Sequence, residues 1–150
     1  MRKGMKTMLF TLAAAFMLSL NCHAMTPGTC QENETEAKKA FVEKFYAGFE
    51  DILDYAYVKK FVTPNVIQLL ADSYDFDCEG ECLATWLFCY EGGGDAGNLM
   101  SRQVKVCDEN HFLVAFKYEG YEYEVLLTVI KEGDKYLIDG LQQKKSEYTN

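Results

Sequence analysis

Asp139 is the residue whose surroundings most favour chemistry, because its carboxylate lies within the otherwise largely apolar run KYLIDGL. Burial raises the pKa of a carboxyl group and lets it act as a general base near neutral pH. A three-residue loop at 132–134 would place Asp139 opposite Leu127 on the apolar side of a hairpin, whereas an even-numbered loop would bury Ile138 instead. We favour the even loop because it buries the larger pair, Tyr136 and Ile138, and leaves Asp139 in water.

Five of the six cysteines follow the N-terminal apolar segment: Cys30, Cys78, Cys82, Cys89 and Cys107. In an oxidising compartment, two disulfides and one thiol are the default for five cysteines. Cys78 and Cys82 could staple the turn between them. Cys89 and Cys107 are the next pair to test, which would leave Cys30 as the thiol, and the sequence leaves the other pairings open.

Other polar candidates carry weaker signals. Zinc is disfavoured because Cys78 and Cys82 lack a second matching pair, and His111 is expected to be exposed at the start of a strand. The run DFDCEGE, 75–81, begins like a calcium loop, but Trp86 stands where the closing Glu belongs, so it predicts a solvated acidic turn. With no nucleophile motif and no phosphate-binding glycine loop, we expect neither metal nor cofactor.

Aromatic side chains are numerous enough to line a ligand pocket. The candidates are Tyr46, Phe49, Trp86, Phe116, Tyr118 and Tyr123. The alternative interpretation is that they fill the core.

The first 24 residues predict an export signal. Three basic residues precede an apolar run and the small-residue pattern Cys22-His23-Ala24, so we expect cleavage after Ala24 and a periplasmic or extracellular protein. About 12 apolar residues fall short of the roughly 20 that span a bilayer. Lipid anchoring at Cys22 is disfavoured because Asn21 precedes it.

The chain is acidic. Its net charge of −8 would fall to about −11 on loss of the signal, and no basic cluster remains. Nucleic acids and anionic membrane surfaces are therefore excluded as partners.

Helical patterns follow a loose leader at 25–33. A first helix is expected from Glu34, with Asn33 and Glu36 as a capping pair, an apolar stripe containing Phe45, and Lys38 pointing away. A short second helix is expected near 55–61. A third should follow, with Thr63 as its cap and Pro64 in its first position.

Alternating patterns then predict four antiparallel strands near 99–107, 111–118, 121–131 and 135–142, before a polar tail at 144–150. A two-residue turn at 119–120 places Phe112 opposite Leu127 and Val114 opposite Val125 on one apolar face. Helices followed by such a meander predict an α+β domain, 34–143, with the helices on a curved sheet of four or slightly more strands.

The segments AFVEKFYAGF, KKFVTPNVIQLL and KEGDKYLIDGLQ resemble the nuclear transport factor 2-like superfamily, especially its small exported bacterial members of unknown function. The resemblance covers roughly residues 35 to 143. It implies a curved sheet that wraps the first helix as a cone with a cavity. The cysteine-rich DCEGECLATWLFC departs from the family pattern.

The resemblance also implies candidate chemistry. Isomerases and dehydratases of this superfamily use an inward carboxylate or histidine with a tyrosine hydroxyl, which correspond here to Asp139 and Tyr46. We expect instead a non-enzymatic exported module that binds a small apolar molecule, a peptide or a partner protein. The alternatives are a cofactor-free lyase or isomerase, and a structural module that forms a homodimer through its open sheet face.

Overall fold

The computed structural model describes residues 31–89 and 97–149. Helices come first and strands follow: α1 (Gln31–Gly48), α2 (Tyr55–Val58), α3 (Pro64–Asp72), the 3-10 helix η1 (Thr85–Phe88), β1 (Leu99–Val106), β2 (His111–Tyr118), β3 (Tyr121–Glu132) and β4 (Lys135–Tyr148). The strands form one antiparallel sheet in the order β1-β2-β3-β4. This confirms the predicted α+β class, while the cone shape stays a prediction. The signal at 1–24, the leader up to residue 30, the thiol of Cys30 and the glycine-rich segment up to residue 96 lie outside the described residues.

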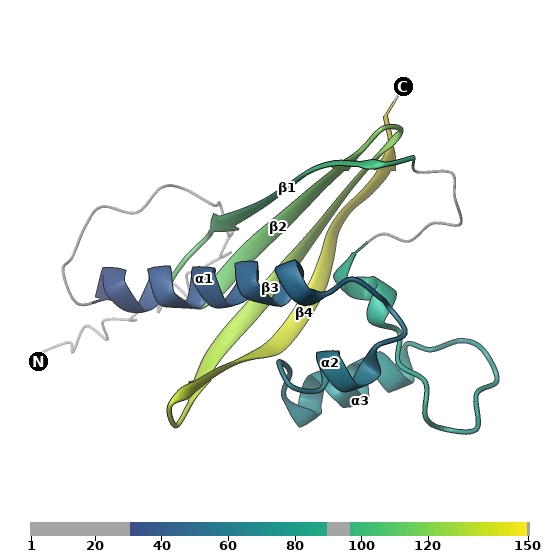
Figure 1. The fold of residues 1–150 in the computed structure, drawn as a ribbon, viewed down its shortest axis with the longest axis horizontal. Helices are drawn as coiled ribbons and strands as arrows, with labels where there is room; N and C mark the ends of the chain where they lie inside the picture. The colour runs from purple at the N-terminus through teal and green to yellow at the C-terminus, as the bar shows by residue number, and fades with distance from the viewer. Residues whose placement is uncertain (1–30, 90–96, 150) are drawn as a thin grey trace, which may run out of the picture.

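Figure 1 shows α1 crossing one face of the sheet, with α3 beside β4. The spacing of Val42, Phe45 and Tyr46 places them on one side of α1, and all three are buried. The helix begins at Gln31, before the predicted start at Glu34. Asn33 therefore lies within the helix, and the expectation that it caps the helix was wrong.

Lys38 does not point away from the protein as the helical pattern predicted. The residue is buried, and its Nζ donates hydrogen bonds to the carbonyl oxygen of Glu109 over 3.2 Å and to Oδ1 of Asn110 over 2.7 Å. An ion pair of 3.3 Å joins it to Glu34. Its long stem carries the ammonium group to the β1–β2 turn, so this lysine attaches α1 to the sheet.

The predicted hairpin register is confirmed. Phe112 lies opposite Leu127 and Val114 opposite Val125, and all four are fully buried. The other face pairs Lys117 with Glu122. The sheet therefore has one face covered by helices and one outer face, as the alternation indicated.

The last hairpin has the even loop. Glu132 pairs with Lys135 around a two-residue turn in which Gly133 has φ +59°, a left-handed conformation that suits glycine. Ile138 pairs with Val129 and is fully buried, as expected, but Tyr136 is only partly buried and Asp139 is not left in water as predicted. Asp139 is the extra residue of a bulge, because the next pair joins Thr128 to Gly140.

The polar segment predicted as a tail from residue 144 is largely strand. β4 continues to Tyr148, whose ring packs edge-on against Tyr121 with centroids 4.9 Å apart. Lys145 forms ion pairs with Glu122 across the sheet and with Glu147 on its own strand. These cross-strand pairs explain why a polar sequence extends the sheet.

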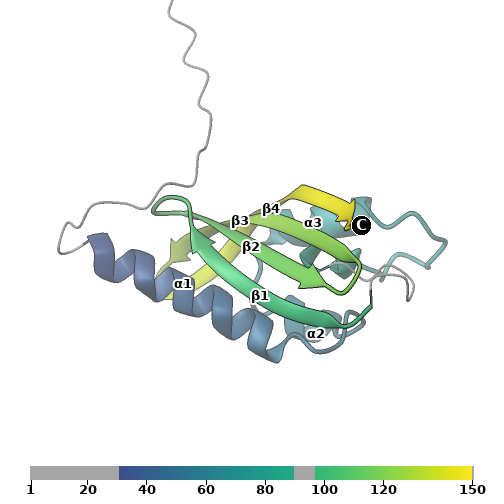
Figure 2. The same ribbon diagram turned by 90° about the horizontal axis from the view of Figure 1, so that it is seen from above.

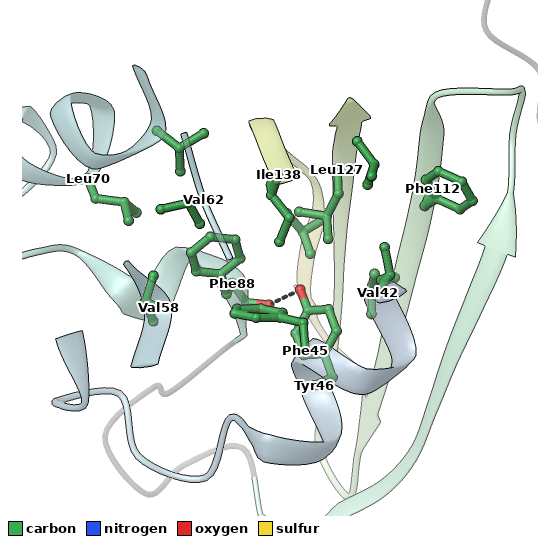
Figure 3. Close-up of a cluster of buried hydrophobic side chains, with 14 of the residues drawn as sticks. Val42, Phe45, Tyr46, Val58, Val62, Leu70, Phe88, Phe112, Leu127 and Ile138 are labelled. Atoms are coloured by element: carbon green, nitrogen blue, oxygen red, sulfur yellow. Dashed lines mark hydrogen bonds between the residues drawn. The ribbon is translucent and has the colours of Figure 1, made fainter. Parts of the chain in front are cut away.

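Phe45 lies at the centre of the core (Figure 3). Its ring contacts those of five aromatic residues: Tyr46, Phe49, Tyr57, Phe61 and Phe88. Helices α1 and α2, the segment that follows α2, and η1 therefore meet around one ring.

Candidate functional site

Asp139 serves as a structural carboxylate in this fold. It is half-buried, and its Oδ1 accepts a hydrogen bond of 2.8 Å from the hydroxyl of Thr63, the residue before α3. That hydroxyl makes no capping bond to the helix, so the predicted capping role of its side chain was wrong. Asp139 thus ties β4 to the start of α3.

Tyr46 also has a structural partner. Its hydroxyl donates a hydrogen bond of 2.9 Å to the carbonyl oxygen of Phe88, drawn as a dashed line in Figure 3. Burial holds the pKa of Tyr46 well above its ordinary value, so the hydroxyl keeps its proton. Arg102 lies 5.4 Å from the ring centroid and donates to the Tyr46 carbonyl oxygen over 3.1 Å.

The hydrogen bonds of Asp139 and Tyr46 go to different segments, Thr63 and Phe88, and do not join the two residues. A general base and a polarising hydroxyl need to converge on one substrate. The arrangement gives no support to the proton-transfer pair that the family resemblance implied.

The remaining aromatic candidates pack in or near the core. Tyr123 donates a hydrogen bond of 2.9 Å to the carbonyl oxygen of Leu87, and burial raises its pKa. Phe116 is buried, while Phe49 and Tyr118 pack against the core from its margin. Trp86 lies apart from them, with its ring 5.2 Å from that of Tyr74. These contacts show the six side chains as packing residues, and their predicted role as a ligand pocket stays a prediction.

Cys78 and Cys82 form a disulfide, one of the pairs considered from the sequence. The pair Cys89 and Cys107 does not form, because Cys107 is bonded in a disulfide while Cys89 remains a thiol. Spacing alone could not distinguish these pairings, because the fold decides which sulfurs meet.

His111 belongs to a turn motif. Its Nδ1 lies 2.8 Å from Oδ2 of Asp108, and its side chain is about one-third exposed, close to the exposed position expected. Partial burial acts to raise the pKa of Asp108, but hydrogen bonds from Asn110 and His111 together hold it below its ordinary value. Within residues 31–89 and 97–149, no group of three or more His, Cys, Asp or Glu side chains could hold a metal ion.

An open hollow lies outside the core, where α2, α3 and the turn closed by the Cys78–Cys82 disulfide meet. Its volume is about 1000 Å3, and it is lined by Tyr55, Ala56, Lys59, Ile67, Ala71 and the segment 78–83. We call it the α2–α3 groove. Tyr55, Ile67 and Leu83 contribute apolar surface, while Glu79 and Glu81 lie in the turn that the disulfide closes.

The segment between α3 and η1 extends away from the sheet in both ribbon views (Figures 1 and 2). It carries Phe76, whose side chain is 72% exposed although its ring lies 5.9 Å from that of Tyr74. The sequence signals for this region were the two cysteines and the acidic run. They indicated the turn but not the groove, which forms only when α2 and α3 pack beside it.

The outer face of the sheet is a second unusual surface. The register places apolar side chains near its centre: Leu113, Leu126, Ile130 and Leu137. Charged side chains on the same face balance, with Lys105, Lys117, Lys135 and Lys145 against Glu122, Glu124, Glu132 and Glu147. In a chain of net charge −8, a balanced face stands out.

Among the described elements, no helix has both the length and the apolar character needed to cross a membrane. No protein-family model, no curated protein and no solved structure significantly matches the chain.

Proposed function

We propose that this protein is an exported, non-enzymatic module that binds a partner protein through the α2–α3 groove. The observation that carries the proposal is the open groove of about 1000 Å3 beside a core filled with aromatic side chains. Small-molecule sites enclose most of their ligand. A groove open to solvent suits a segment of polypeptide better.

The chemistry of the interior favours binding over catalysis. Tyr46 and Asp139, the two candidates for proton transfer, have structural partners in Phe88 and Thr63. To polarise a substrate oxygen, the hydroxyl of Tyr46 would have to give up its hydrogen bond to the Phe88 carbonyl oxygen. A binding module needs no such rearrangement, because the groove lies outside the core.

The Cys78–Cys82 disulfide supports export, because disulfides persist in oxidising compartments. The superfamily resemblance is part of the same proposal, since it includes small exported proteins with helices before a four-stranded meander.

Site-specific photo-crosslinking in the native compartment tests the proposal. Ala56 is exposed and lines the groove, whereas Ala40 is exposed on α1, away from it. A benzophenone amino acid in place of Ala56 should give a discrete protein adduct, and the same replacement of Ala40 should not. Equal labelling from both positions, or none from Ala56, would overturn the proposal.

A second candidate function is self-association through the outer sheet face. The balanced charges and the apolar centre around Leu113 and Leu126 support it, because two acidic molecules could meet there with little repulsion. Sedimentation equilibrium would show a dimer that Leu113→Glu dissociates. A monomer at high concentration would rule it out.

A further inference from the structure

The charges around the α2–α3 groove indicate what it binds. Five carboxylates lie between residues 72 and 81, namely Asp72, Asp75, Asp77, Glu79 and Glu81, and this stretch contains no lysine or arginine. In the described part of the chain, none of the five has a basic side chain within ion-pair distance. Elsewhere, Glu34 and Glu122 are paired with lysines. Of these carboxylates, Glu79 and Glu81 line the groove itself, together with one basic side chain, Lys59, which forms no ion pair with either of them. The rim therefore carries a net negative charge.

The floor of the groove is apolar. Tyr55 and Ile67 are partly buried, Leu83 is 4% exposed, and Ala71 adds a small apolar side chain to the lining. An apolar floor beside an acidic rim is complementary to a segment with one apolar side and one basic side.

The acidic rim of the groove, Glu79 and Glu81, is also constrained in the unbound protein. Glu79 and Glu81 both lie between the bonded residues Cys78 and Cys82, and Gly80 between them has φ +86°. Closing the turn with a disulfide restricts the positions of both carboxylates, so less conformational entropy is lost on binding.

We propose that the α2–α3 groove binds a cationic amphipathic segment of a partner protein. Its apolar side chains enter between Tyr55, Ile67 and Leu83, and its lysines or arginines pair with Glu79 and Glu81. This inference rests on the proposed binding function and specifies the chemistry of the partner.

Fluorescence anisotropy with designed peptides tests it, using protein purified with its disulfides intact. The probe is a labelled peptide of leucine and lysine, about 14 residues or roughly four helical turns long, with leucines along one side. A second peptide carries glutamate in place of every lysine, and a third carries serine in place of every leucine. Only the leucine–lysine peptide should bind saturably, and more weakly as salt is added.

Matched variants separate local from overall charge. Glu79→Lys with Glu81→Lys should weaken binding at least about tenfold, because two attractive contacts become repulsive. Glu36→Lys with Glu43→Lys changes the net charge equally on the exposed side of α1 and should leave affinity nearly unchanged. Ala56→Trp, which fills the groove without changing charge, should also weaken binding.

Two results would overturn the inference: no binding of the leucine–lysine peptide, or equal loss of affinity in the rim and α1 variants. If the glutamate peptide bound as tightly, and Ala56→Trp blocked it, the cationic partner would be wrong while the groove would still be a binding site. Absence of a crosslink from Ala56 would instead remove the proposed function itself.

Discussion

The hydroxyl of Thr63 donates a hydrogen bond of 2.8 Å to Oδ1 of Asp139, joining residues 76 positions apart in the sequence. Two backbone bonds flank it: Thr63 N–H donates to the Ile138 carbonyl over 2.9 Å, and Ile138 N–H donates to the Phe61 carbonyl over 2.8 Å. The bulge at Asp139 directs its carboxylate to this junction. β4 and the start of α3 are thereby attached through both backbone and side chain.

Asp139→Ala should therefore reduce stability without affecting the groove. The change leaves the hydroxyl of Thr63, a residue only 5% exposed, without its acceptor. We expect the free energy of unfolding to fall by about 1 to 3 kcal/mol. Urea denaturation measures this loss.

Thr63→Ala is the matched partner variant. The double variant should lose less than the sum of the two single losses, because each single change already breaks the shared bond. Strictly additive losses would show that the bond contributes nothing. Loss of peptide binding in a fully folded Asp139→Ala protein would contradict a purely structural role.

Lys38→Met should destabilise the attachment of α1 to the β1–β2 turn. The Glu109 carbonyl and Asn110 side chain lose a charged donor, which predicts a loss of about 1 to 3 kcal/mol. Lys39→Met is the control, since Lys39 has only an ion pair of 3.8 Å with Glu43 and should change stability by about 0.5 kcal/mol or less. Guanidinium denaturation distinguishes them, and equal losses would show that the buried bonds are unimportant.

Tyr46→Phe should change how stability depends on alkaline pH. Burial raises the pKa of Tyr46 in the folded protein above its ordinary value of 10.0. Above about pH 10 the unfolded chain therefore releases a proton that the folded chain retains, and stability falls as pH rises. Tyr46→Phe removes the hydroxyl that titrates. We therefore expect the variant to be about 1 kcal/mol less stable than the natural protein at pH 8, and this difference in the free energy of unfolding should shrink above pH 10.

Denaturant unfolding at a series of pH values from about 8 to 12 measures that difference. Tyr148→Phe is the control, because Tyr148 is 63% exposed and the change should alter stability at pH 8 by no more than about 0.5 kcal/mol. A Tyr46→Phe deficit that stays constant through this range would contradict a protonated, buried hydroxyl.

Replacing Cys78 and Cys82 together with serine should affect binding more than folding. The disulfide closes a very short loop, for which the chain-entropy relation gives about 2 kcal/mol at most. The two rim glutamates would lose their constraint, so affinity for the leucine–lysine peptide should fall while the fold persists. Thermal unfolding and fluorescence anisotropy on the same samples measure the two effects. Unchanged affinity would show that the disulfide does not position Glu79 and Glu81 for binding.

The strand register could be predicted because it depends on local features. Turn length and the alternation of Phe112, Val114 and Phe116 fix which side chains share a face. The even loop before β4 followed from the preference for burying Ile138. The bulge at Asp139 left no such sequence signal, and it arises where α3 meets the strand.

The errors involve long-range contacts. Lys38 has the spacing of a solvent-facing residue, yet its stem reaches a turn 71 positions away. The sequence after Gln143 has the composition of a tail, but Glu122 and Tyr121 give it partners in β3. The α2–α3 groove likewise depends on how separate segments pack, which no single stretch of sequence encodes.

β4 forms an edge of the sheet, and among residues 31–89 and 97–149 a single bridge, between Val62 and Ile138, pairs with that edge. The unpaired backbone groups of an edge strand can pair with a strand of another molecule and so lead to aggregation. Here two irregularities, at Asp139 and at Lys144, break the edge into short stretches that an incoming strand could not match continuously. We expect the β4 edge to resist the addition of a second chain, because one of these irregularities places the charged side chain of Lys144 along it.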